Sequence, residues 1–170
     1  MEVRPATAFD LDAVAEVHVR SWQETYAGQV PQEYLDSLSV EQRRRGWTIA
    51  HDDTDGRAAI LVLVDDGAVV GFAHVCPSRD ADASDGVGEV TSIYLRRSHW
   101  GREGGRTLMA GARDALAGYG FLEATLWVLE TNERARRFYE ADGWLFDGAE
   151  KRDSIGDMQV KEVRYRRSLT

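Results

Sequence analysis

The chain has 170 residues, of which 43% are hydrophobic, and a formal net charge of −8 at pH 7. This length and composition predict one folded α/β domain over residues 1–170 rather than a disordered chain. The negative charge argues against a nucleic-acid-binding protein that neutralises phosphates. Cys76 is the only cysteine, which excludes an intramolecular disulfide and a cysteine-cluster metal site. Without a signal sequence or an apolar run of transmembrane length, we expect a cytoplasmic protein with no membrane partner.

The N-terminal part predicts a short edge strand followed by helices. Thr7 with Asp10 three residues later resembles a capping box. Apolar or aromatic side chains then recur at helical spacing: Leu11, Val14, Ala15, His18 and Trp22. This first helix ends near Gly28, and two more follow, the last over residues 39–50. We expect His18 to be packed and hydrogen-bonded on the apolar face, with a catalytic role as the alternative.

The middle of the chain predicts a hairpin framed by two polar loops. Residues 51–56 are the first loop, and residues 58–65 and 68–75 are apolar strands. Asp66-Gly67 between the strands is a strong signal for a tight turn. The second loop, residues 77–88, is acidic but lacks the ligand pattern of a calcium loop. We expect this loop to be solvated and mobile. It directly precedes the central strand, so its negative charge could attract a cationic amine to a binding site beside that strand.

The region around which the chain is organised follows this loop. Residues 89–95 (EVTSIYL) predict a strand, and residues 106–116 predict an amphipathic helix. The loop between them is rich in arginine and glycine. Its glycines let the backbone turn, so that successive amides can converge on an anion at the positive end of the helix: Gly101, Gly104 and Gly105. This pattern predicts a phosphate-binding loop, to which Arg102 and Arg106 add positive charge.

Two kinds of nucleotide loop do not fit this region. A Walker-type loop needs Gly and Lys where this chain has Trp100 and Arg106. The glycine spacing also differs from that of a dinucleotide fingerprint. An ordinary glycine-rich turn with solvated arginines remains the alternative to a phosphate site.

The remaining elements are a strand, a helix and two closing strands. Residues 124–129 predict a strand, and a helix begins at Thr131-Asn132 and is ended by Gly143. After it, Val160 and Val163 alternate imperfectly in a segment that we expect to pair with the one before it as two antiparallel strands.

Two motifs carry a resemblance to a known family. The run WGREGGRTLM resembles the acetyl-CoA loop of the GNAT superfamily of N-acetyltransferases, written Gln/Arg-x-x-Gly-x-Gly/Ala. With Gly105 aligned to the last glycine, Glu103 replaces the first and Trp100 replaces Gln or Arg. The run LWVLETNERARRFYEADGW resembles the family's second signature, in which Asn132 and Tyr139 are seven positions apart. The resemblance is strong over roughly residues 58–147.

The resemblance implies a fold and a co-substrate. The implied fold is an α/β (α+β) GNAT fold, with a mixed, mostly antiparallel twisted sheet of about seven strands, flanked by about four to five helices and splayed between the fourth and fifth strands. The implied co-substrate is acetyl-CoA, without a metal. Coenzyme contacts would come from the central strand, the loop and the helix after it, and from the second signature: Ile93, Tyr94, Leu95, Trp100, Gly101, Arg102, Glu103, Gly104, Gly105, Arg106, Thr107, Asn132 and Phe138.

Acetyl transfer to an amine needs a base, because a protonated amine has no lone pair with which to attack. Glu89 matches a strand position from which some family members present a catalytic Glu, with a solvent-facing carboxylate as the alternative. Glu130, His74 or a water molecule are the other candidates for the base. Tyr139 matches the family's general acid, and its phenol is protonated at pH 7. We expect direct transfer, since neither motif pairs a Ser or Cys nucleophile with a base.

The acceptor is expected to be a primary amine of a small molecule, enclosed by the aromatic N-terminal helices. By resemblance, Trp22, Glu24 and Tyr26, together with His74, are candidate acceptor contacts. A protein N-terminus or lysine is the alternative acceptor. A catalytically weak acyl-CoA-binding module, suggested by Glu103, and a nucleotide-binding α/β protein are alternative functions. A homodimer is possible by resemblance.

Overall fold

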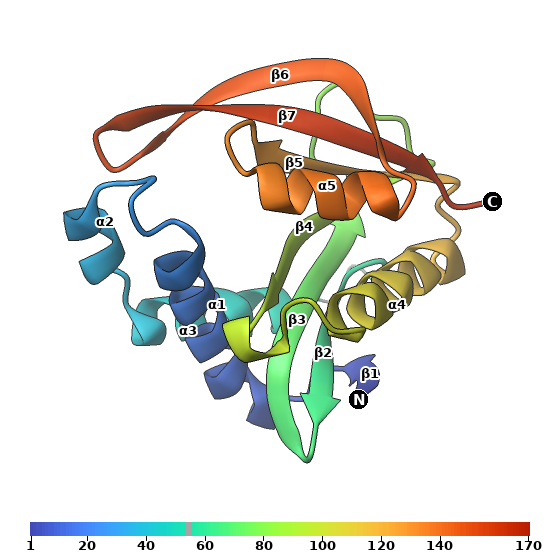
Figure 1. Ribbon diagram of the computed structural model, residues 1–170. Coiled ribbons are helices and arrows are strands. Elements are labelled where there is room, and N and C mark those ends of the chain that lie inside the picture. The colour runs from blue at the N-terminus through green and yellow to red at the C-terminus, as the bar shows by residue number, and fades with distance from the viewer. Residues whose placement is uncertain (54–55) are drawn as a thin grey trace.

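A computed structural model describes residues 1–53 and 56–170. Seven strands form one sheet in the order β1-β2-β3-β4-β5-β7-β6 (Figure 1). Their bounds are Glu2–Pro5 (β1), Ala59–Asp65 (β2), Ala68–Pro77 (β3), Val87–Leu95 (β4), Glu123–Leu129 (β5), Leu145–Ile155 (β6) and Met158–Ser168 (β7). Only β4 and β5 are parallel, and the other neighbours are antiparallel. The predicted mixed, mostly antiparallel sheet is confirmed.

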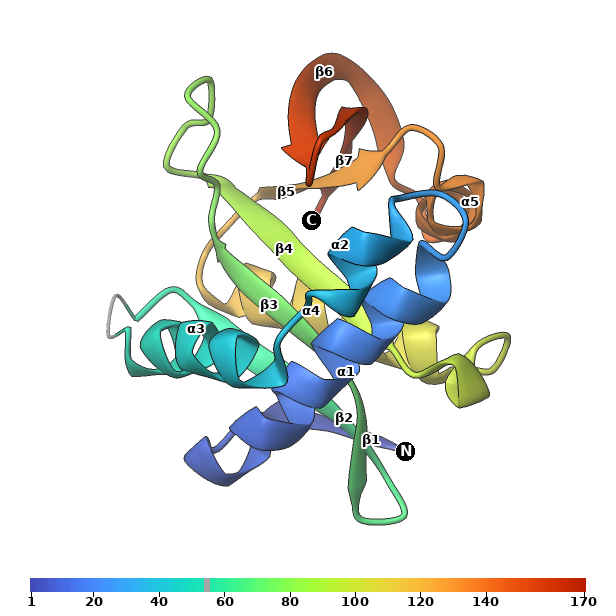
Figure 2. The ribbon, with the colours of Figure 1, turned by 90° about the vertical axis from the view of Figure 1, so that its left-hand side faces the viewer.

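Helices cover both faces of the sheet. The α-helices are Leu11–Thr25 (α1), Gln32–Asp36 (α2), Val40–Asp52 (α3), Gly104–Gly118 (α4) and Glu133–Ala141 (α5), with short 3-10 turns at Ala8–Asp10 (η1) and Arg97–His99 (η2). Figure 2 shows α1 and α3 on one face and α4 behind the sheet. Phe72 packs in the core under α1, whereas Leu108 and Trp144 belong to the larger core on the other face. No helix in the described part of the chain is long and apolar enough to span a membrane.

The sheet is splayed between its fourth and fifth strands, as predicted. The pairing of β4 with β5 covers only Val87 to Glu89 against Glu123 to Thr125. Beyond Glu89 the two strands separate, so the backbone groups of β4 that face β5 have no strand partner there. The gap therefore begins at Glu89 and widens towards Leu95, at the end of β4 that leads into the glycine-rich loop.

A β-bulge decides which side chains of β4 face α1. Val90 is paired with Val75, but Ser92 is paired with His74, so Thr91 is the extra residue. Paired residues on neighbouring strands share a face of the sheet, and without the bulge Glu89 and Ser92 would face opposite sides. The bulge thus places Glu89 and Ser92 together on the α1 face of the sheet.

The hairpin of β6 and β7 reaches over the end of the sheet to α2 (Figure 1). Its tip packs into a third apolar cluster built from the segment between α1 and α2, from α2, from β5 and from the hairpin: Tyr26, Val30, Leu35, Leu129, Ile155 and Val160. A Cβ atom on Gly156 at the tip would lie 3.3 Å from the ring of Tyr34. The hairpin tip and α2 are therefore in close contact.

Three local predictions need correction. The third helix runs to Asp52, so only part of the predicted loop 51–56 follows it, and residues 54–55 lie outside the described chain. Gly104 and Gly105 are helical, so they do not make the turn; Gly101, with φ of 70°, does. The acidic loop is not solvated throughout, because Asp80 accepts hydrogen bonds from the nearly buried Arg164 and from Trp127.

Candidate active site

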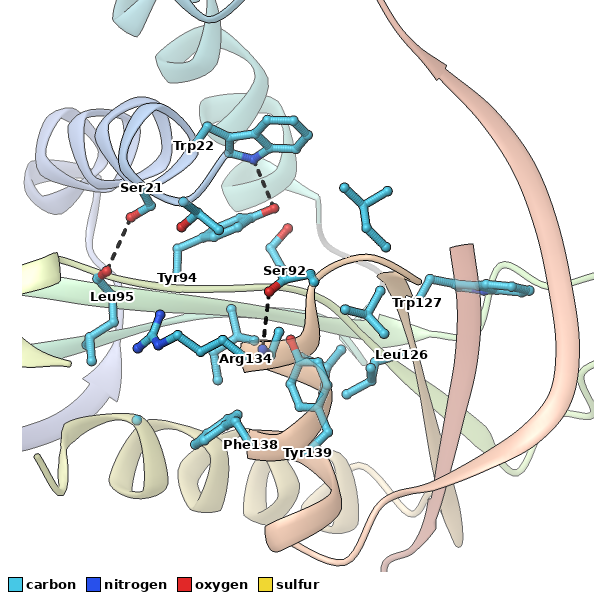
Figure 3. Close-up of a pocket in the computed structure, with 18 of the residues that line it drawn as sticks. Ser21, Trp22, Ser92, Tyr94, Leu95, Leu126, Trp127, Arg134, Phe138 and Tyr139 are labelled. Atoms are coloured by element: carbon cyan, nitrogen blue, oxygen red, sulfur yellow. Dashed lines mark hydrogen bonds between the residues drawn. The ribbon is translucent and has the colours of Figure 1, made fainter. Parts of the chain in front are cut away.

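A cavity of about 1090 Å³ runs through the splay between β4 and β5 (Figure 3). Its walls come from β4 and β5, from the N-terminal part of α4, from the length of α5, from the C-terminal half of α1, and from the hairpin of β6 and β7. It joins two regions that lie far apart in the sequence: the glycine-rich loop and the third apolar cluster, which lies under the hairpin.

Most of the residues predicted to contact the coenzyme line this cavity. They are Ile93, Tyr94, Leu95, Trp100, Gly101, Arg102, Gly105, Arg106, Asn132 and Phe138. Glu103, Gly104 and Thr107 belong to the same segment but are not part of the lining. Gly104 packs against the sheet, since a Cβ there would lie 3.1 Å from Leu63. The hydroxyl of Thr107 donates to the carbonyl of Glu103 at 3.0 Å.

The N-terminus of α4 is open to an anion. Its first turn is closed by the amide of Thr107, which donates to the carbonyl of Glu103 at 2.9 Å, and the amides before it have no partner within the helix. Glu103 is the N-cap residue, yet its carboxylate is exposed and makes no capping bond, so it does not fill this position. A Cβ on Gly105 would lie 3.2 Å from the Phe138 ring, so glycine allows α4 and α5 to pack closely.

Tyr139 projects from α5 into the cavity (Figure 3). The residue is 8% exposed, and its ring packs against those of Phe138 and Tyr165. Burial, with a smaller contribution from Tyr94, raises the pKa of the phenol above its ordinary value. Among the described residues, nothing hydrogen-bonds to the phenol oxygen, which leaves the hydroxyl available to a molecule in the cavity.

Glu89 lies at the closed end of the splay and is 2% exposed. Arg79, from the acidic loop, makes all three hydrogen bonds to its carboxylate: the amide at 3.0 Å, Nε at 3.2 Å and an η nitrogen at 2.8 Å. A carboxylate has about four acceptor positions, so roughly one is left for water or substrate. The alternative of a solvent-facing carboxylate does not hold for Glu89.

The other two candidate bases lie outside the cavity lining. Glu130 is at the surface, where Lys161 at 2.8 Å holds the pKa of its carboxyl below the ordinary value. His74 faces Thr91, with 2.7 Å between Nδ1 and the hydroxyl oxygen. Burial, and secondarily Arg79, lowers the pKa of His74, so its imidazole is neutral at pH 7.

The end of the cavity under the β6 and β7 hairpin is aromatic and hydrogen-bonded. Trp22 donates its indole N–H to the hydroxyl of Tyr94 at 3.1 Å (Figure 3), and its ring lies 4.6 Å from that of Tyr26. Asn132 caps α5 through the amide of Ala135, and its side-chain NH₂ lies 3.5 Å from the Tyr26 hydroxyl. Of the predicted acceptor contacts, Trp22 and Tyr26 line the cavity, whereas Glu24 and His74 do not.

Sequence reasoning missed several residues of this cavity. They come from the acidic loop, α1, α2, β5, α5 and the closing hairpin, and include Ser21, Tyr34, Arg79, Trp127, Arg134, Lys151, Asp153 and Glu162. Most of them lie outside both motifs, and only the fold brings them to the cavity. In residues 1–53 and 56–170, no group of His, Cys, Asp or Glu side chains has the arrangement of a metal site.

Comparison with known proteins places this geometry in a family. The model of the acetyltransferase (GNAT) family matches residues 13–144. The chain belongs to this family. An uncharacterised N-acetyltransferase, YuaI of Bacillus subtilis, is 33% identical over 95% of this chain and 89% of its own length. The spermidine N(1)-acetyltransferase of Thermoplasma acidophilum is 25% identical over 97% of this chain and 98% of its own.

A solved N-acetyltransferase structure has the same fold. The PaiA N-acetyltransferase of Thermoplasma acidophilum, in complex with coenzyme A, aligns with a TM-score of 0.77 and 23% identity over 98% of both chains. The predicted family, fold and enzyme class, an N-acetyltransferase, are therefore confirmed.

Proposed function

We propose that this GNAT protein transfers the acetyl group of acetyl-CoA to a primary amine of a small molecule, by direct attack of the amine on the thioester. The observation that carries the proposal is the continuity of the cavity, which joins the open N-terminus of α4, the splay beside β4, the free phenol of Tyr139 and an aromatic end. A thioester held in the splay would have its carbonyl between the general acid and an amine that enters from the aromatic end.

The coenzyme would be bound mainly by backbone groups. The unpartnered amides of Gly105 and Arg106 would hold the diphosphate at the positive end of α4. Backbone groups of β4 that lack a partner on β5 would bind the pantetheine arm. A backbone N–H near Ile93 to Leu95 would stabilise the negative charge that develops on the carbonyl oxygen.

Glu89 and Tyr139 would move the protons. Glu89 faces the α1 side of the sheet and would accept the amine proton through a water molecule bound at its remaining acceptor position. As the new C–N bond forms and the C–S bond breaks, the leaving sulfur would take a proton from the Tyr139 hydroxyl. The raised pKa of Tyr139 suits this role, because the phenol stays protonated in neutral and mildly alkaline solution.

The position of the hairpin favours a small amine over a protein. The tip of the β6 and β7 hairpin packs on α2, and Asp153, Ser154 and Ile155 of β6 line the cavity. We infer that an extended peptide would have to displace this hairpin. The relative named a spermidine acetyltransferase supports an amine of this size.

A thiol-release assay tests the proposed function. Acetyl-CoA would be combined with a panel of polyamines, amino acids and short peptides with free N-termini, and product acetylation followed by mass spectrometry. We expect saturable turnover with at least one small amine and none with the peptides. Turnover with peptides alone would reject the small acceptor. Tight acetyl-CoA binding without turnover for any amine would instead indicate a catalytically weak acyl-CoA-binding module.

A further inference from the structure

Trp100 stands where the resembled loop motif carries Gln or Arg, and a cation from another element lies on it. The indole N–H of Trp100 donates to the carbonyl of Leu95 at 2.9 Å, which fixes the ring beside the end of β4. The guanidinium of Arg134, from the first turn of α5, lies 3.5 Å from the centre of this ring. Figure 3 shows Arg134 reaching from α5 towards Leu95. A positive charge therefore lies against the residue that replaces the motif's polar one.

In the described chain this positive charge has no ion-pair partner. No carboxylate of residues 1–53 or 56–170 forms an ion pair with Arg134, and the same holds for Arg97, Arg102 and Arg106 in the same loop and helix turn. Arg97 lies over the same indole, 5.8 Å from its centre. Among the described residues, the one carboxylate in contact with these arginines is that of Glu24, which accepts from the backbone amide of Arg97 at 3.3 Å. Four guanidinium groups without an ion pair in the described part of the chain, whose net charge is −8 overall, indicate a site for an anion.

We propose that Arg134 is a phosphate-binding residue, which α5 supplies in place of the polar side chain missing from the loop at Trp100. The inference rests on the proposed coenzyme site. Trp100 holds the guanidinium by a cation–π contact at the mouth of the splay, across from the open amides of α4. A diphosphate at those amides meets the planar guanidinium from the other side, where Arg can bind two phosphate oxygens.

Calorimetric titration of coenzyme A tests the role of Arg134. We expect Arg134→Ala to weaken binding about 10-fold to 100-fold and to reduce its dependence on salt concentration. Arg45→Ala is the matched control, because it removes an exposed arginine whose partner, Glu41, is on the same distant helix. Its coenzyme affinity should equal that of the wild type. The melting temperature of each variant, measured without ligand, reports any effect on folding.

Rescue separates phosphate binding from a merely structural contact between α5 and the loop. In the Arg134→Ala background, Trp100→Arg should recover most of the lost affinity, because it restores a cation at the motif's own position. Wild-type affinity in Arg134→Ala would overturn the inference. The inference would also be overturned if Arg134→Ala lowered both the affinity and the melting temperature and Trp100→Arg failed to recover the affinity. If the wild type itself binds no coenzyme A, the proposed function fails as well.

Discussion

Single residues decide the chemistry, and only some could be assigned from the sequence. Tyr139 and Asn132 belong to a motif with fixed spacing, so the place of Asn132 at the start of α5 and of Tyr139 within it could be predicted. Glu89 was a candidate by its place on the strand, but its contact with Arg79 connects residues from a loop and a strand. Nothing in a single sequence reports such a pair. The bulge at Thr91, which turns Glu89 towards the α1 side, has no sequence signal either.

Substitutions of the proposed acid and base test these residues. Tyr139→Phe and Glu89→Gln should each lower kcat by roughly 10-fold to 1000-fold, because each removes a proton transfer. Glu130→Gln, a surface carboxylate paired with Lys161, serves as the control and should leave kcat unchanged. Affinity for coenzyme A should stay the same in all three variants. Wild-type kcat in both Tyr139→Phe and Glu89→Gln would show that the roles are wrongly assigned.

The pH profile adds a second test of Tyr139. Because burial raises the pKa of the phenol, its protonated form persists to higher pH than an ordinary tyrosine, whose pKa is about 10. Loss of the Tyr139 proton should therefore not lower the wild-type kcat at any pH below about 10.

At the scale of elements, periodicity predicted the strands and helices well and the loops poorly. The amphipathic pattern of α4 and the turn at Asp66-Gly67 are local signals, and both elements form as predicted. The acidic loop is held by Arg164, which is distant in the sequence, so its composition suggested more solvent exposure than it has. The length of the β6 and β7 hairpin, and its contact with α2, also depend on tertiary packing.

Leu35 tests whether this contact encloses the acceptor. The side chain is fully buried between α2 and the hairpin tip but does not line the cavity. Leu35→Ala should lower the free energy of unfolding by about 2–5 kcal/mol and raise the KM for the amine, because the hairpin loses its support. Leu35→Met, which conserves volume, should change stability by less than about 1.5 kcal/mol. A raised KM for acetyl-CoA, with an unchanged KM for the amine, would contradict this role of the hairpin.

At the scale of the whole molecule, two short motifs sufficed for the fold and the family. Residues of both motifs line the gap between β4 and β5. The order of the two motifs along the chain therefore predicted which strands separate. The unusual parts of the site were not predictable in this way. Trp100 and Glu103 appeared as departures from the motif, and only the fold shows that Arg134 lies on Trp100 and that the Glu103 side chain does not cap the open helix end.

A crystal structure of the protein with acetyl-CoA tests the central claim most directly, since it shows whether the splay holds the thioester. We predict that the diphosphate lies within hydrogen-bonding distance of the amides of Gly105 and Arg106, with the sulfur next to the Tyr139 hydroxyl. Coenzyme bound outside the gap between β4 and β5, or with its sulfur far from Tyr139, would contradict the account.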